Sequence, residues 1–238
     1  MEFLKQTLDW VQSEYNRPCI LTALGQGSLI LKAANPDILA VTVDTGYLFP
    51  ETLQFLRDLN DVGIEIEMTH PSESVADYER RHRGSLHHRD PDLCCCQRKV
   101  EPLRNWIIHH QIDAVVVGAR RDQGGGREQL SVLTPNQGPE NTDQIAPLAD
   151  YNQAQIDARY RNLGLPQHAL WAAGYNSVGC WPCTMPGSGR NGRWPYAPKR
   201  TECGIIVSKE ATVTPRFRVV APALAGRGSG GMPPTPWV

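Results

Sequence analysis

Two groups of cysteines constrain this chain more than any other feature of its sequence. Three of the seven cysteines are contiguous, from Cys94 to Cys96, and a Cys-Trp-Pro-Cys motif places Cys180 close to Cys183. The odd count and the length of 238 residues disfavour a secreted disulfide scaffold, because a chain of this size can bury a core without cross-links. Clustered cysteines in such a chain are typical of metal ligands or redox groups.

The adjacent cysteines together with the Cys-x-x-Cys motif can supply the four thiolates that zinc or an iron–sulfur cluster takes. Neighbouring Cα atoms lie only about 3.8 Å apart, which is awkward for one tetrahedral zinc ion and less so for a cubane with separate iron corners. The spacing therefore favours a cluster over zinc. A third interpretation, buried cysteines acting as small hydrophobes, fits poorly beside Gln97, Arg98 and Lys99.

The charges of the chain are nearly balanced, with 24 Lys and Arg against 25 Asp and Glu and a net charge of -1. No global basic field indicates nucleic acid or a membrane surface as a partner, so any anion site must be local. The sequence has neither a spanning stretch of about 20 apolar residues nor a signal-peptide pattern at its start. We therefore expect a cytoplasmic protein.

Short apolar runs alternate with helical periodicity along the first half of the chain, and this alternation indicates an α/β fold. Its mostly parallel sheet would carry helices on both faces. We expect strands at residues 19–23, 38–43, 64–68 and 114–117, and helices at 3–15, 29–34, 50–59 and around 100–107.

Ligands of such sheets bind beyond the carboxyl ends of the strands. Three segments fall there and predict three walls of one pocket: Gly25-Gln26-Gly27, Asp44-Thr45-Gly46 and Gly118-Ala119-Arg120-Arg121. Cationic side chains beside glycines or cysteines would clamp a phosphate or sulfate there, although each alone is more often a solvated surface residue. They are Lys99, Arg120, Arg121, Arg127, Arg190 and Arg193.

Cys203 stands apart from the other cysteines, in Lys199-Arg200-Thr201-Glu202-Cys203-Gly204. Basic neighbours favour the nucleophilic thiolate, so Cys203 is a candidate nucleophile, with an ordinary exposed cysteine as the alternative. We predict two parts in the chain: a nucleotide- and cluster-binding α/β domain over 1–185, and a mobile segment over 186–238 that carries Cys203. The segment is of low complexity beyond about 215.

Several further segments follow one another in a recognisable order between Tyr15 and Ile205. They are Val43–Gly46 with Pro50–Thr52, Cys94–Cys95 with Arg98–Val100 and Pro102–Leu103, Gly118–Gln123 with Arg127, Pro147–Asp150, Gly179–Thr184, Arg190–Trp194 and Thr201–Ile205. Together they resemble the assimilatory adenylyl-sulfate reductases, the iron–sulfur branch of the family that also contains the phosphoadenylyl-sulfate reductases. The resemblance implies an adenine-nucleotide alpha-hydrolase-like (PP-loop-like) fold.

The resemblance also implies a [4Fe-4S] cluster on Cys94, Cys95, Cys180 and Cys183, with Cys96 as an extra residue. In the family mechanism the Cys203 thiolate attacks the sulfur of adenylyl sulfate, AMP leaves, and an S-sulfocysteine remains. A thioredoxin dithiol then releases sulfite. Such a protein acts in sulfate assimilation and depends on a separate thioredoxin.

Three alternatives stay open at this point. Phosphoadenylyl sulfate as substrate would need one more cation for its 3'-phosphate, which Arg127 can supply. An adenylating thiolase of the same fold is disfavoured because its pyrophosphate loop is missing at Leu24 to Ser28. A cluster-bearing binding protein with an impaired site is suggested by Ile206, which stands where the family signature has a histidine. The oligomeric state, a homo-oligomer included, is not set by the sequence.

Overall fold

A six-stranded sheet forms the centre of the computed structural model, which describes residues 2–197, 200 and 202. The strand order is β3-β2-β1-β4-β6-β5, and every neighbouring pair is parallel except β5 with β6. The strands are β1 (Pro18–Leu21), β2 (Leu39–Val43), β3 (Glu67–Thr69), β4 (Ala114–Val117), β5 (Leu133–Thr134) and β6 (Asp143–Ile145). The predicted mostly parallel sheet is confirmed.

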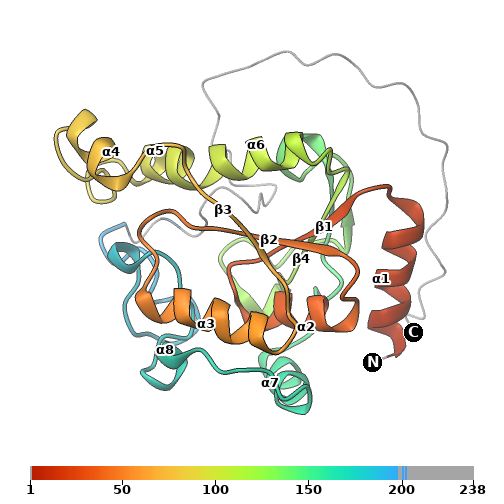
Figure 1. The fold of residues 1–238 in the computed structure, drawn as a ribbon. Helices are drawn as coiled ribbons and strands as arrows, with labels where there is room; N and C mark the ends of the chain where they lie inside the picture. The colour runs from red at the N-terminus through yellow and green to blue at the C-terminus, as the bar shows by residue number, and fades with distance from the viewer. Residues whose placement is uncertain (1, 198–199, 201, 203–238) are drawn as a thin grey trace.

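Alternate residues of the central strands face opposite layers, which is why these strands read as continuous apolar runs. Ile20 and Val116 join the core under α1, α2, α3 and α7. Cys19, Val115 and Val117 join a second core under α6. Figure 1 shows these helices on the two sides of the sheet, so the prediction of helices on both faces is also confirmed.

Helices fill most of the connections between strands. They are α1 (Glu2–Glu14), α2 (Gln26–Ala34), α3 (Pro50–Asp61), α4 (Val75–Arg81), α5 (Pro91–Cys95), α6 (Glu101–His109), α7 (Gln153–Asn162) and α8 (Ala169–Ala172), with a π-helix η1 (Cys96–Val100) and 3-10 turns η2 (Arg121–Gln123), η3 (Pro139–Asn141) and η4 (Trp181–Cys183). No helix in this described part of the chain is long and apolar enough to span a bilayer.

The third strand begins later than its apolar pattern predicts. Ile64 and Ile66 are both buried, but hydrogen bonding to β2 begins only at Glu67. The two isoleucines instead pack into the core on the α3 side of the sheet. The apolar pattern of this run reflects burial of the two isoleucines, and the hydrogen-bonded strand begins only after them.

The chain remains packed beyond residue 185. The Met185 amide donates to the Gly192 carbonyl, the Gly187 amide donates to Gly174, and the Trp194 side chain is buried. These contacts hold the first residues of the predicted C-terminal segment against the region that carries Cys183. The boundary between 185 and 186 stays a prediction, and residues 203–238 lie outside the described residues.

His168 is a buried cap whose protonation should weaken the fold. Its Nδ1 accepts from the Leu170 amide and its Nε2 contacts the Thr52 hydroxyl at 3.0 Å, so the neutral ring satisfies both partners. Burial lowers the pKa of His168. The unfolded chain binds this proton near pH 6.5, so the contribution is complete above that pH and is lost as pH falls toward the lower folded pKa.

We therefore expect His168→Asn, which keeps a side-chain cap, to lower the free energy of unfolding by about 1–3 kcal/mol at pH 7. The difference between the two proteins should narrow as pH falls from 7 to 5, because only the parent has the ring to protonate. Urea unfolding at several pH values measures this difference. A gap that stays constant with pH would contradict the assignment.

Candidate active site

A cavity of about 670 Å³ opens at the carboxyl ends of the central parallel strands. All three predicted segments contribute to it, through Gly25 to Gly27, Thr45, and Gly118 to Arg120. Its described lining also includes residues 176–180 and 188–190, which come from the region after α8. The site thus combines the sheet edge with segments that lie far away in sequence.

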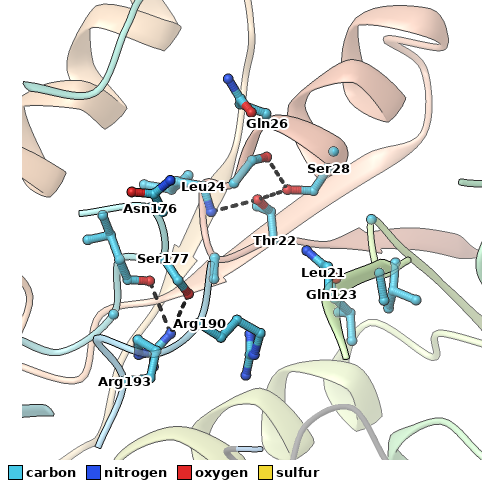
Figure 2. A pocket seen from close by; sticks show the side chains of 18 of the residues that line it. Leu21, Thr22, Leu24, Gln26, Ser28, Gln123, Asn176, Ser177, Arg190 and Arg193 are labelled. Carbon is cyan, nitrogen blue, oxygen red and sulfur yellow. Dashed lines mark hydrogen bonds between the residues drawn. The ribbon is translucent and has the colours of Figure 1, made fainter. Parts of the chain in front are cut away.

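A strained turn joins β1 to the cavity. Leu24 adopts a φ of 59°, which is uncommon for a residue with a side chain. Its amide donates to the Thr22 hydroxyl at 2.8 Å, and that hydroxyl lies 2.6 Å from the Ser28 hydroxyl, as Figure 2 shows. This hydroxyl pair holds the turn, and α2 therefore begins with its N-terminus at the cavity. The free amides of a helix N-terminus favour an anion.

Two glycines allow α2 to start this close to β4. A Cβ on Gly118 would lie 2.4 Å from the Ser28 nitrogen, and a Cβ on Gly27 would lie 2.7 Å from the Gly118 carbonyl oxygen. Both clashes are with backbone, so no side-chain movement can relieve them. Glycine at both positions therefore permits the close backbone contact between the start of α2 and the end of β4, at the base of the cavity.

The second wall is organised by Arg98. Its guanidinium is buried and donates to the Thr45 carbonyl at 2.9 Å and to the Glu73 carbonyl at 2.7 Å. It also lies 5.0 Å from the centre of the Tyr78 ring. Gly46, with a φ of 77°, leaves room for it, since a Cβ there would lie 2.7 Å from an Arg98 nitrogen. Arg98 thus ties the cysteine-bearing helix to the end of β2.

Cys94, Cys180 and Cys183 lie in the same region beside this wall. The Cys94 thiol interacts electrostatically with those of Cys180 and Cys183, and Cys94 and Cys180 share one apolar cluster. Burial and the neighbouring Cys180 raise the pKa of Cys94 to about 11, and burial likewise raises the pKa of Cys183. Cys180 also lines the cavity and contacts the Thr45 hydroxyl at 3.1 Å. Through Cys180, this set of three cysteines borders the cavity directly.

Local helix geometry separates Cys94 and Cys95 from Cys96. The α-helix α5 ends at Cys95, and the chain continues as the π-helix η1, a rare geometry that is frequent at functional sites. Cys94 is buried and Cys95 half-buried, whereas Cys96 is exposed and faces Glu101. This arrangement sets Cys96 apart from the other thiols.

The donor set fits an iron–sulfur cluster. Besides the thiols, the Tyr78 hydroxyl is buried next to Cys94 and interacts with its thiol. Such a donor suits a thiolate or sulfide acceptor. Among the described residues, no three His, Cys, Asp or Glu side chains lie close enough together to hold a metal ion.

Cationic side chains outnumber carboxylates among the described residues that line the cavity. The cations are Lys99, Arg120, Arg127, Arg190 and Arg193, and the carboxylates are Asp122, Asp157 and Glu202. This balance gives a local excess of positive charge in a chain whose net charge is -1.

Trp194 organises the arginines that follow the Cys-x-x-Cys motif. Arg193 stacks on its ring at 4.6 Å, and Arg190 lies 5.6 Å from the ring centre. Arg193 also donates to the Ser177 hydroxyl, as Figure 2 shows, while its Nε is buried without an acceptor in the described ranges. The Arg193 side chain lines the cavity, where its charge favours an anion.

Glu202 forms the most buried ion pair of the site. Its carboxylate accepts from Arg127 Nε at 2.5 Å and from Arg127 Nη2 at 2.9 Å, and Arg190 Nη2 lies 3.2 Å away. The side chains of Glu202 and Arg127 are only 5 % and 6 % exposed. Arg127 and Arg190, which the sequence assigns to substrate, thus hold a carboxylate of this chain.

Three predicted substrate residues do not line the cavity. Asp44 accepts from the Gly46 amide at 2.7 Å and shapes the turn after β2. Gly46 accommodates Arg98. Arg121 pairs with Asp150 and donates to the Leu130 carbonyl at 2.8 Å, outside the cavity lining. The predicted catalytic Cys203 lies outside the described residues.

Three residues of the site were missed as functional candidates. Arg98 and Glu202 lie inside motifs that the sequence reveals, the Arg-Lys pair after the cysteines and the Glu-Cys-Gly triplet. The sequence does not reveal that both side chains are buried charges with long-range partners, because those partners are distant in sequence. Gln153, which accepts from Arg120 at 2.7 Å, was missed for the same reason.

A family model described as the phosphoadenosine phosphosulfate reductase domain matches residues 22–186. Similar proteins include an adenosine 5'-phosphosulfate reductase of Salinibacter ruber, 33% identical over 76% of this chain and 73% of the relative. Another of that name, from Streptomyces coelicolor, is 32% identical over 84% of this chain and 86% of its own length. A phosphoadenosine 5'-phosphosulfate reductase of Gloeobacter violaceus is 34% identical, with coverage of 78% and 80%.

Solved structures show the same fold. A phosphate complex of phosphoadenylyl-sulfate reductase from Candida auris superposes with a TM-score of 0.68 at 24% identity, covering 76% of this chain and 90% of that one. An FMN adenylyltransferase of Candida glabrata, with FAD and pyrophosphate, gives a TM-score of 0.54 at 14% identity over 72% and 57%. The predicted nucleotide-binding fold is thus confirmed. From the family model and the relatives together, this chain belongs to the phosphoadenosine phosphosulfate reductase family.

Proposed function

We propose that this protein reduces adenylyl sulfate to sulfite and AMP in sulfate assimilation, with Cys203 as nucleophile and a thioredoxin dithiol as reductant. One observation carries the proposal. Glu202, the residue before Cys203, is held by an ion pair in the wall of a cationic cavity. Cys180, one of the proposed cluster ligands, lines the same cavity. Family membership and the names of the relatives support the substrate class.

The cavity suits a nucleotide that carries an anionic sulfate. The N-terminal amides of α2 and the guanidinium of Arg193, which lines the cavity, are donors for phosphate or sulfate oxygens. Lys99 and Arg190 line the same space and supply positive charge. Neutralising the substrate's charge in this way would allow an anionic thiolate to approach the sulfur.

The proposed reaction has two steps. The Cys203 thiolate attacks the sulfate sulfur, an S–S bond forms, and the S–O bond to the phosphate breaks so that AMP leaves with the electron pair. A thioredoxin thiolate then attacks the Cys203 sulfur and displaces sulfite, and the second thioredoxin thiol restores the Cys203 thiolate. The dithiol becomes a disulfide, which balances the two-electron reduction of sulfate to sulfite.

Cys94, Cys95, Cys180 and Cys183 would hold a [4Fe-4S] cluster. When bound, it would supply fixed charge beside the cavity and hold the two cysteine segments together. The described cysteines are free thiols, and a reducing compartment such as the cytoplasm suits them.

Steady-state assay tests this proposal. Anaerobically purified protein, supplied with adenylyl sulfate, thioredoxin, thioredoxin reductase and NADPH, should release sulfite and AMP in equal amounts. Absence of sulfite from protein with a full complement of iron and sulfide would reject the enzymatic proposal. The alternative of a cluster-bearing binding protein would then account for the cavity.

Phosphoadenylyl sulfate is the second candidate substrate, because one of the relatives is named for it. Arg127, the cation that a 3'-phosphate would need, pairs with Glu202 through two nitrogens. We therefore expect kcat/KM for phosphoadenylyl sulfate to be lower by about a hundredfold, since a charged group would be bound without a partner. Competition between the two nucleotides measures the ratio, and equal values would remove adenylyl sulfate as the preferred substrate.

A further inference from the structure

We propose that Glu202 is a positioning residue, which seats the segment carrying Cys203 against the carboxyl end of β4 through Arg127 and Arg190. This inference rests on the proposed function, because it concerns how the nucleophile reaches the cavity. It assigns to Arg127 a role in holding the protein's own carboxylate, in place of the substrate contact that its sequence motif suggests.

The ion pair between Arg127 and Glu202 is bidentate and buried. Two guanidinium nitrogens of Arg127 face the two carboxylate oxygens of Glu202 in a bidentate arrangement, at 2.5 and 2.9 Å. Arg190 reaches one of the same oxygens at 3.2 Å. Because Glu202 and Arg127 are almost fully buried, water cannot replace either partner, and breaking the pair would leave a buried charge.

Arg127 is itself anchored to the sheet. Its third guanidinium nitrogen donates to the Gln123 side-chain oxygen, which also accepts from the Arg120 amide at 3.1 Å. Arg120 follows β4 by only a few residues, and its guanidinium is held by Asp122 at 2.8 Å. The chain between Gln123 and Arg127 turns through three glycines with positive φ. Glu202 is therefore fixed relative to β4.

Arg190 supplies a second anchor from a different part of the chain. It follows the Cys-x-x-Cys motif and lies over the Trp194 ring. The carboxylate of Glu202 consequently bridges the β4 end of the cavity and the segment next to the thiols. In the proposed role, these two anchors hold the chain at Glu202, the residue before Cys203 in the sequence.

The test compares Glu202→Gln with Glu140→Gln. The second variant makes the same change on an Arg–Glu pair, with Arg104, that is more exposed and does not line the cavity. We expect Glu202→Gln to slow formation of the S-sulfocysteine adduct at least thirtyfold, roughly the effect of breaking a buried charge pair. AMP affinity, measured by calorimetry, should change less than about threefold, and Glu140→Gln should match the parent.

A double-mutant cycle with Arg127→Gln separates positioning from substrate binding. Positioning predicts that the double variant forms the adduct no more slowly than the slower single variant, because both changes remove one interaction. Additive losses, a parallel loss of AMP affinity in Glu202→Gln, or an adduct rate within threefold of the parent would overturn the inference.

A protease assay keeps the inference testable if the proposed function fails. Should the parent form no adduct at all, the reductase proposal falls, but seating of the segment can still be measured. Trypsin cleavage after Arg200, whose side chain is only 11 % exposed, should be at least tenfold faster in Glu202→Gln than in the parent or Glu140→Gln, since cleavage follows local opening. Equal cleavage rates would show that Glu202 does not hold the segment.

Discussion

Replacing Cys183 with serine is expected to remove most of the iron and sulfide from the anaerobically purified protein, and sulfite production should fall on the order of a hundredfold or more. Cys183 is buried and burial raises the pKa of its thiol, although the Tyr196 hydroxyl lies 2.8 Å from its sulfur; binding to a metal would favour the thiolate much further. Loss of this ligand should also loosen the region between α8 and Trp194, where the Trp194 amide donates to the Cys183 carbonyl.

Cys96→Ser is the matched control for this change. Cys96 adjoins the same group in sequence but is exposed and faces Glu101, so iron, sulfide and sulfite production should remain at parental levels. Metal analysis that finds one zinc ion per chain and no sulfide would contradict the cluster. Equal loss of iron in both variants would mean that Cys96 is itself needed to hold the cluster.

Replacing Cys203 with serine should lower the rate of sulfite release by a factor on the order of ten thousand or more, as for other enzymes that lose their nucleophile. A serine hydroxyl is far less acidic than a thiol and would need a general base to attack sulfur. Iron content and AMP affinity should be unchanged, because serine preserves the size of the side chain and Cys203 is not one of the four proposed cluster ligands. Activity within tenfold of the parent would exclude Cys203 as the nucleophile.

The central strands of the fold could be predicted because they are buried on both faces. Residues 114–117 form β4 with the predicted bounds, because a continuous apolar run of alanine and three valines is typical of a strand buried on both faces. The helix from Pro50 is predicted equally well, because proline and glutamate mark its start.

The strands β5 and β6 could not be predicted in this way. Asp143 and Gln144 begin β6, and Gln144 is buried within the sheet, so the strand lacks an apolar signature. Its position depends on pairing with β4, and β5 depends on β6 in turn. Interactions that depend on tertiary pairing leave little trace in a local pattern.

The candidate site shows the same division. The glycine turns and the cysteine motifs identified the walls of the cavity, because each needs a particular residue type at a fixed spacing. The roles of individual arginines were less accessible: Arg121 pairs with Asp150 outside the cavity, and Arg127 holds Glu202. A guanidinium takes whichever acceptor the fold brings to it, and the sequence does not specify that acceptor.

Intact-mass analysis of anaerobically purified protein, after incubation with adenylyl sulfate and no reductant, tests whether the covalent intermediate forms. We expect a gain of one SO₃ group on Cys203, absent from Cys203→Ser and removed by reduced thioredoxin. Protein with intact cluster that gains no mass while it still binds AMP would contradict the covalent mechanism.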